Sequence, residues 1–167
     1  MQLLPEAVLV ITALVLLGSA VAVEAKTGRP AGGKMTVTIA AVGILLALVA
    51  LFNMPMQSGS GTPLVVVDRM AQLFKGVILC LGLLAVLLPP AKGEIRNIGE
   101  FHALMLFALT GLLLAAGTNH LLFLFVSLEL ASLSLYLLAG FSRTARASEA
   151  SLKYFLFGGV SAAFLLF

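Results

Sequence analysis

The sequence predicts an all-α membrane protein, a polytopic bundle of about six spanning helices. Hydrophobic residues make up 61% of the 167 residues and charged residues only 10%, whereas soluble domains carry roughly 25% charged residues. The apolar residues gather in stretches close to the roughly 20 residues that a helix needs to cross the hydrocarbon core of a bilayer. Helices are expected rather than strands because lipid cannot satisfy the hydrogen bonds of an open strand edge.

Six apolar segments follow one another, and we expect residues 1–167 to form a single membrane domain. The predicted spans lie near residues 4–23, 35–54, 64–88, 98–117, 120–140 and 148–167. The first span has small residues at a spacing typical of signal-peptide cleavage, but it carries Glu6 and no basic residue precedes it, which argues against cleavage.

The last predicted span ends abruptly. We expect Ser148 to cap it, with Glu149 at the favourable N-terminal end of the helix. The apolar run from Tyr154 to Phe167 is too short to reach the far interface, and a terminal carboxylate in hydrocarbon is costly. We therefore expect a helix truncated at its end, in a fragment of a longer protein.

Basic residues occupy every second connection between the predicted spans. Loops 24–34, 89–97 and 141–147 contain Lys or Arg, whereas loop 55–63 and the connection 117–120 contain neither. Because basic loops stay in the cytoplasm, this alternation predicts an N-terminus on the outside of the membrane.

Several function classes leave no signature in this chain. The net charge of +3 comes from short loops rather than from a continuous basic face, so we expect no nucleic-acid partner. No Gly-rich nucleotide-binding motif, zinc-protease motif or CxxC pair occurs, so no cofactor or metal is assigned to this chain. The single cysteine, Cys80, is expected to be a small buried residue of the apolar core.

One acid, Glu129, lies near the centre of the fifth span. It is about 14 Å from one end of the span and about 16 Å from the other at 1.5 Å per residue, which is too far for a short side chain to reach water. Ser132 and Tyr136 follow on the same helical face, which we expect to point into the protein. A protonated Glu129 that only bonds a neighbouring helix remains an alternative, but an acid in the membrane is a functional candidate by default.

Two lysines accompany this acid at other depths. Lys75 lies about 9 Å inside the third span, where it either lines a hydrated path or extends to the outer interface and pairs with Asp68. Lys153 lies one turn inside the sixth span, where it either lines such a path or reaches the cytoplasmic side and pairs with Glu149. Together with Glu129 they suit a proton path, because burial and a nearby carboxylate tune the proton affinity of a lysine.

Two histidines, His102 and His120, lie near opposite ends of their spans. Each is a candidate proton relay, because a histidine changes charge near neutral pH. The alternative for each is an ordinary residue at the membrane interface. From the residues alone, the sequence indicates a polytopic membrane protein that moves protons or cations.

The strings "SLELASLSLYLLAGF" and "SEASLKYFLFGGVSAAFLLF" resemble a known family. It is the antiporter-like membrane subunit N of bacterial respiratory NADH:quinone oxidoreductase, or complex I. The strings "LLPE", "VVVDRMAQLFK" and "GEFHALMLFALTGLLLAAG" extend the resemblance over nearly the whole chain, as an N-terminal part of that subunit.

The resemblance implies a proton-translocating subunit of a complex that oxidises NADH and reduces a quinone such as ubiquinone. In the family, the acid matched by Glu129 pairs with a lysine on a seventh helix, and Lys153 and Lys75 match further lysines. His102, His120 and Asp68 are expected accessories. The seventh helix is absent from this sequence, so the missing C-terminal helices are an expected partner.

The resemblance further implies other membrane and peripheral subunits of complex I as partners, in the bacterial cell inner membrane, where the chain is multi-pass. NADH, FMN, iron–sulfur clusters and quinone would bind to those other subunits. A multi-subunit Na⁺/H⁺ antiporter or a membrane hydrogenase of the same fold is a second reading. A membrane scaffold in which Glu129 only holds helices together is a third.

Overall fold

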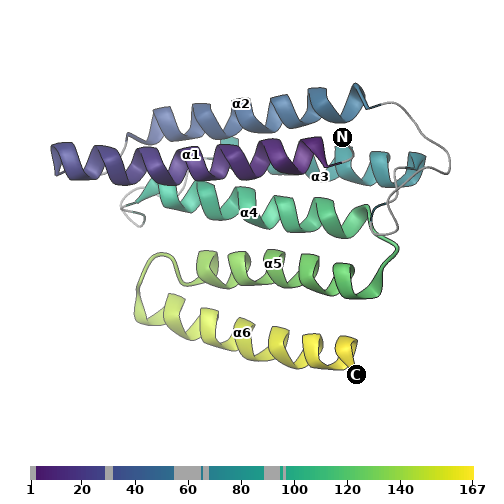
Figure 1. Cartoon of the computed structure of the whole chain (residues 1–167). Coiled ribbons are helices and arrows are strands. Elements are labelled where there is room, and N and C mark those ends of the chain that lie inside the picture. Colours follow the sequence, from purple (N-terminus) through teal and green to yellow (C-terminus); the bar gives the residue numbers. More distant parts are fainter. Residues whose placement is uncertain (1–2, 29–31, 55–64, 66–67, 89–94, 96) are drawn as a thin grey trace.

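The computed structural model describes residues 3–28, 32–54, 65, 68–88, 95 and 97–167. The described residues form six antiparallel α-helices, each long and apolar enough to cross a membrane (Figure 1). They are α1 (Leu4–Thr27), α2 (Gly33–Phe52), α3 (Arg69–Leu87), α4 (Ile98–Ala116), α5 (Leu121–Ala139) and α6 (Ala145–Leu166). The six predicted spans are confirmed, with boundaries within five residues. Loop 55–63 and most of loop 89–97 lie outside the described residues.

Helices α1 to α4 form a four-helix bundle around one apolar core. Helix α1 packs against α2 and α4, and α3 packs against the same two, so α1 and α3 occupy diagonal corners without backbone contact. The core side chains come from all four helices, with Leu9, Leu16, Ile44, Leu79, Leu106 and Leu113 completely buried.

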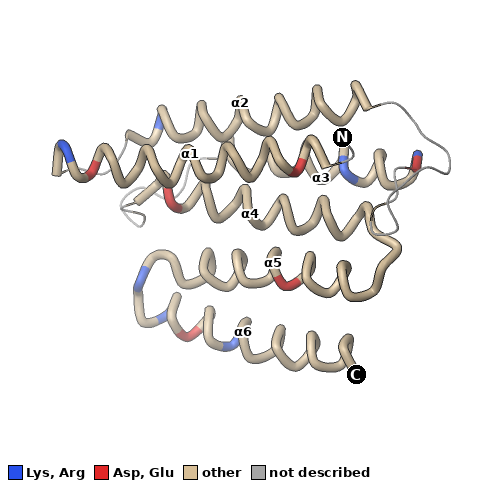
Figure 2. The backbone as a smooth tube through the Cα atoms, in the orientation of Figure 1, with Lys and Arg blue, Asp and Glu red and all other residues tan. Residues whose placement is uncertain are grey.

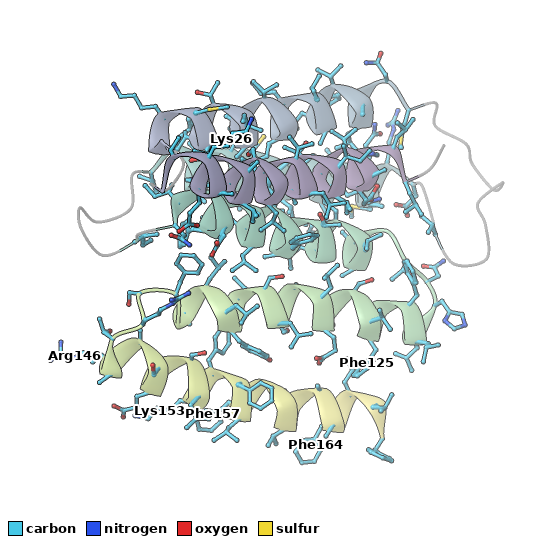
Figure 3. The ribbon with its side chains drawn as sticks, turned by 60° about the vertical axis from the view of Figure 1, so that its left-hand side comes forward. Lys26, Phe125, Arg146, Lys153, Phe157 and Phe164 are labelled. Carbon is cyan, nitrogen blue, oxygen red and sulfur yellow. The ribbon has the colours of Figure 1, made fainter. Side chains whose placement is uncertain are left out.

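Helices α5 and α6 extend the molecule as an arm on one side of this bundle. Helix α5 packs along α4, and α6 packs on α5 alone (Figure 1). No residue of α6 is buried, and Phe157 and Phe164 are 75% and 82% exposed. These apolar side chains point away from α5, as suits a surface that meets lipid or further helices (Figure 3).

Small residues bring the helices close together. Since lipid is as apolar as a leucine side chain, helices in a membrane associate through tight packing rather than through the hydrophobic effect. A side chain at Gly43 would collide with Thr12 of α1, and one at Gly82 would meet Leu109 of α4 at 2.5 Å. At Gly111 an added Cβ would lie 2.6 Å from the backbone nitrogen of Ala131, so α4 and α5 are nearly in backbone contact.

Two details of the predicted helices are wrong. Helix α6 begins at Ala145 because Thr144, not Ser148, caps it: the Thr144 hydroxyl accepts a 3.2 Å hydrogen bond from the Ala147 amide. Cys80 is exposed on α3 rather than buried, because an apolar run in a membrane helix includes the side that faces outward.

The basic residues of the described chain gather largely at one end of the bundle (Figure 2). Lys26 is in the last turn of α1, Lys34 in the first turn of α2, and Arg143 and Arg146 lie between α5 and the first turn of α6. The helix directions place all of these at the same end (Figure 1). At the opposite end, α3 begins with Arg69 directly after Asp68, so the two charges offset each other.

Candidate functional site

Glu129 lies near the middle of α5, and its side chain is half-buried. Among the described residues, no side chain or backbone group forms a hydrogen bond or an ion pair with it. A carboxylate at mid-membrane that lacks a partner either takes up a proton or waits for a charge from outside. Its position agrees with the sequence prediction, and its partner is not among helices α1 to α6.

The helical stripe that contains Glu129 faces α6. Tyr136, two turns further along, is 7% exposed and packs against α6. Its ring meets Tyr154 edge-on with centroids 4.8 Å apart, and its hydroxyl occupies the space where Gly158 has no side chain. Phe125, one turn before Glu129, also extends toward α6 (Figure 3).

A different face of α5 packs on α4. Ser127, Ala131 and Ser134 are buried there, and each serine hydroxyl donates to a carbonyl one turn earlier in its own helix. Because the hydroxyls are satisfied within α5, this contact adds no titratable group. Glu129 therefore lies beside the tight α4–α5 seam, on the side that turns to α6.

Lys153 does not pair with Glu129 in the structure. Its Nζ donates to Glu149 Oε1 at 2.5 Å, and the two side chains are 65% and 63% exposed. Lys153 points away from α5 (Figure 3). The alternative that the sequence left open, an i,i+4 pair with Glu149, is the arrangement found.

Lys75 is deeply buried, and its partner is Glu6. Lys75 Nζ lies 2.6 Å from Glu6 Oε1, and the two residues are 4% and 3% exposed. The predicted alternative, a pair between Lys75 and Asp68, is wrong because Asp68 caps α3, accepting a 2.7 Å hydrogen bond from the Ala71 amide. Among the described residues Lys75 pairs with Glu6 and not with Glu129.

Glu6 is the partner of Lys75 that sequence reasoning missed. The sequence contained a signal for this pair. Because α1 and α3 run in the same direction, an acid near the start of α1 and a lysine near the start of α3 lie at a similar depth in the membrane. An isolated acid and an isolated lysine at one depth should be tested as a pair, because each is costly alone.

The two histidines have different surroundings. His102 is buried, its Nδ1 lies 2.8 Å from the Ile98 carbonyl oxygen, and its ring meets Phe101 edge-on. Its side chain therefore lies inside the bundle, close to the start of α4. His120 is exposed where α5 begins, and its amide donates to the Thr118 hydroxyl at 3.1 Å.

Comparison with known proteins shows what this chain is similar to. Residues 118–167 match the family described as NADH:quinone oxidoreductase/Mrp antiporter, TM. The chain is 38% identical over its whole length to NADH-quinone oxidoreductase subunit N of Myxococcus xanthus, and covers 32% of that protein. It is 36% identical over its whole length to F(420)H(2) dehydrogenase subunit N of Methanosarcina mazei, and covers 35% of it.

A solved structure has the same fold. A chain of respiratory complex I from Thermus thermophilus, solved with bound aureothin, superposes with a TM-score of 0.76 and is 31% identical. The match covers 97% of this chain and 34% of that one. The chain thus spans about a third, or less, of the relatives it matches. In sequence and fold it corresponds to part of an antiporter-like membrane subunit N of the complex I type, which confirms the resemblance predicted from its motifs.

Proposed function

We propose that this chain is part of a proton-translocating membrane subunit that couples NADH oxidation and quinone reduction to proton pumping. The observation that carries the proposal is the match to the complex I chain over 97% of the residues with 31% identity. It agrees with the half-buried acid of α5, which has no partner among the described residues and is therefore available to one.

Glu129 has the central role in this proposal. Its carboxylate raises the proton affinity of a lysine that approaches from helices beyond α6. When the two charges separate, the lysine loses that stabilisation and releases its proton. Glu129 is only half-buried, so part of its side chain is open to such a helix.

The other candidate residues lie in different parts of the molecule. Lys153 is at the end of the arm where the basic residues gather, in reach of water. Lys75 belongs to a separate pair inside the bundle, and Asp68 lies exposed at the start of α3. His120 lies at the water-facing start of α5, and His102 is buried at the other end of α4.

The partners and the location follow from the same reading. Other membrane and peripheral subunits carry the NADH site, FMN, the iron–sulfur clusters and the quinone site, and further helices of the subunit complete the path. The location is the bacterial inner membrane. The end of the bundle that gathers the basic residues is then cytoplasmic, and the N-terminus is outside.

A second function on the same fold has its own support. The matched family description includes the Mrp antiporter, and one full-length match is to a subunit named for F(420)H(2) dehydrogenase. Isolated membranes that contain the complete complex distinguish these. NADH-dependent proton movement supports the first function, whereas movement driven only by reduced F420 or by a sodium gradient supports the second.

Exchange of Glu129→Gln in the complete enzyme tests the proposed role. Glutamine keeps the size of the side chain but removes the charge, so proton pumping in proteoliposomes should fall at least about tenfold, since a positioned proton-transfer group contributes roughly 10²–10⁴-fold. Glu100→Gln is the matched control, because Glu100 only accepts a hydrogen bond from Asn97 at the start of α4. Normal pumping with normal NADH oxidation in Glu129→Gln would refute the role.

A further inference from the structure

The buried pair of Glu6 and Lys75 is incompletely satisfied. Glu6 Oε1 accepts the Lys75 ammonium, but Glu6 Oε2 is buried without any hydrogen-bond partner. An ammonium has three N–H donors, and within the described part of the chain only the bond to Glu6 is formed by Lys75. The buried pair therefore has one hydrogen-bond acceptor without a partner, Glu6 Oε2, and further N–H donors on Lys75.

A water molecule fits this combination. Buried waters make roughly 2–4 hydrogen bonds to polar groups that the protein leaves unsatisfied. A water between Glu6 Oε2 and an N–H of Lys75 would satisfy both groups, whereas a dry pair would leave the carboxylate oxygen at the full cost of desolvation.

A polar stripe leads from this pair to the end of the bundle. Asp68 is exposed at the start of α3, Gln72 is half-buried one turn on, and Lys75 is buried after it. Gln72 donates to the Leu51 carbonyl at 2.9 Å, so its side chain bridges α3 and α2 at this depth. Exposure falls stepwise along one helical face, as in a short hydrated entry.

We propose that Glu6 and Lys75 are a second proton-holding site, filled from the end of the bundle where α1 and α3 begin. The inference rests on the proposed function, because it gives the transported protons an additional site. The proton moves from Lys75 Nζ to Glu6 Oε1, so that ammonium and carboxylate become amine and carboxylic acid without change of net charge. A proton that arrives along the hydrated entry then binds the amine, and the carboxyl group releases its own proton to the bridging water, so one proton enters, one leaves and the ion pair is restored.

This site is separate from Glu129. Neither α1 nor α3 contacts α5, because α4 lies between them. The other ionisable groups at this end of the described chain are Asp68, Arg69 and His120, all exposed, and the last turns of α2 and α4 contribute none. The proton affinity of the pair is thus governed by its two members and by water.

The competing explanation is that the ion pair only holds α1 and α3 together. The variant Glu6→Gln in the complete complex distinguishes this structural role from a proton-holding role. Glutamine still offers a carbonyl oxygen to Lys75, so the contact persists, but it cannot hold the proton. Because Lys75 then lacks its counter-charge, the thermal midpoint of the complex should fall. In the complex that does assemble, proton pumping in proteoliposomes should be reduced at least about tenfold, as for loss of a proton-transfer group. Glu100→Gln should pump normally.

The same assay on Glu129→Gln keeps the two proposals apart. If Glu129→Gln loses pumping while Glu6→Gln pumps normally, the second site is refuted and the proposed function stands. If both variants pump normally, the proposed function is refuted as well.

A second measurement decides the case in which Glu6→Gln does not assemble. Glu6→Asp keeps the charge, and infrared difference spectroscopy of the turning-over complex reports a protonated carboxyl group by its carbonyl band. A band that shifts between the unchanged complex and Glu6→Asp supports the proton-holding site. A spectrum that is the same in both overturns it.

Discussion

The four-helix bundle and the α5–α6 arm handle membrane charge in opposite ways. In the bundle, Glu6 and Lys75 are almost completely buried and neutralise each other across its diagonal. In the arm, Glu129 is half-buried with no partner among the described residues, and Lys153 turns outward to Glu149. The bundle pairs its buried acid with a lysine, whereas the acid of the arm has no partner among the described residues.

Lys75→Met should have the largest effect on stability, because it leaves the bundle with an unpaired acid, as the arm has. It leaves the Glu6 carboxylate buried without its cation, and such a change destabilises a protein by about 3–5 kcal/mol. The thermal midpoint of the complete subunit in detergent should fall accordingly. The double variant Glu6→Leu/Lys75→Met should recover most of the loss, because an apolar pair of similar volume replaces the ion pair. A double variant as unstable as the single one would show that the charges themselves hold the bundle.

Gly111→Ala should have an intermediate effect, at the seam between bundle and arm. The new Cβ would lie 2.6 Å from Ala131 N and 2.7 Å from the Ser127 carbonyl oxygen, and backbone cannot move aside as a side chain can. Overpacking of this kind costs typically about 1–3 kcal/mol, again measured as a lower thermal midpoint. Gly18→Ala is the matched control, because nothing lies within 4 Å of its added carbon. Equal midpoints for the two variants would mean that α4 and α5 are not in backbone contact.

Glu149→Gln should have the smallest effect. Its pair with Lys153 is more than half exposed, and exposed i,i+4 pairs contribute about 0.3–0.5 kcal/mol. The midpoint should therefore stay within error of the unchanged subunit. A fall as large as that of Lys75→Met would show that a further helix covers this pair in the complete protein.

Much of the fold could be predicted from the sequence, because a membrane span is set by length and apolarity. All six helices followed from the length of the apolar runs, and the place of Glu129 near the middle of α5 followed from its distance to the ends of its run. The capping residue of α6 could not be predicted in this way. Thr144 and Ser148 are both good capping residues, and only the position at which the helix begins decides between them. The Glu6–Lys75 pair depends on which helices lie diagonally, and no local pattern contains that information.

The diagonal ion pair also constrains how the protein enters the membrane. A charged residue costs about 2.5–3.5 kcal/mol when its helix inserts alone near the bilayer centre. Helix α1 carries one charge of the pair and α3 the opposite one, so each helix alone exposes to lipid a charge that the pair neutralises. Helix α1 is synthesised before α2 and α3, so Glu6 meets its cation only after α3 has inserted. The pairing of α1 with α3 is therefore a late step in the assembly of the bundle.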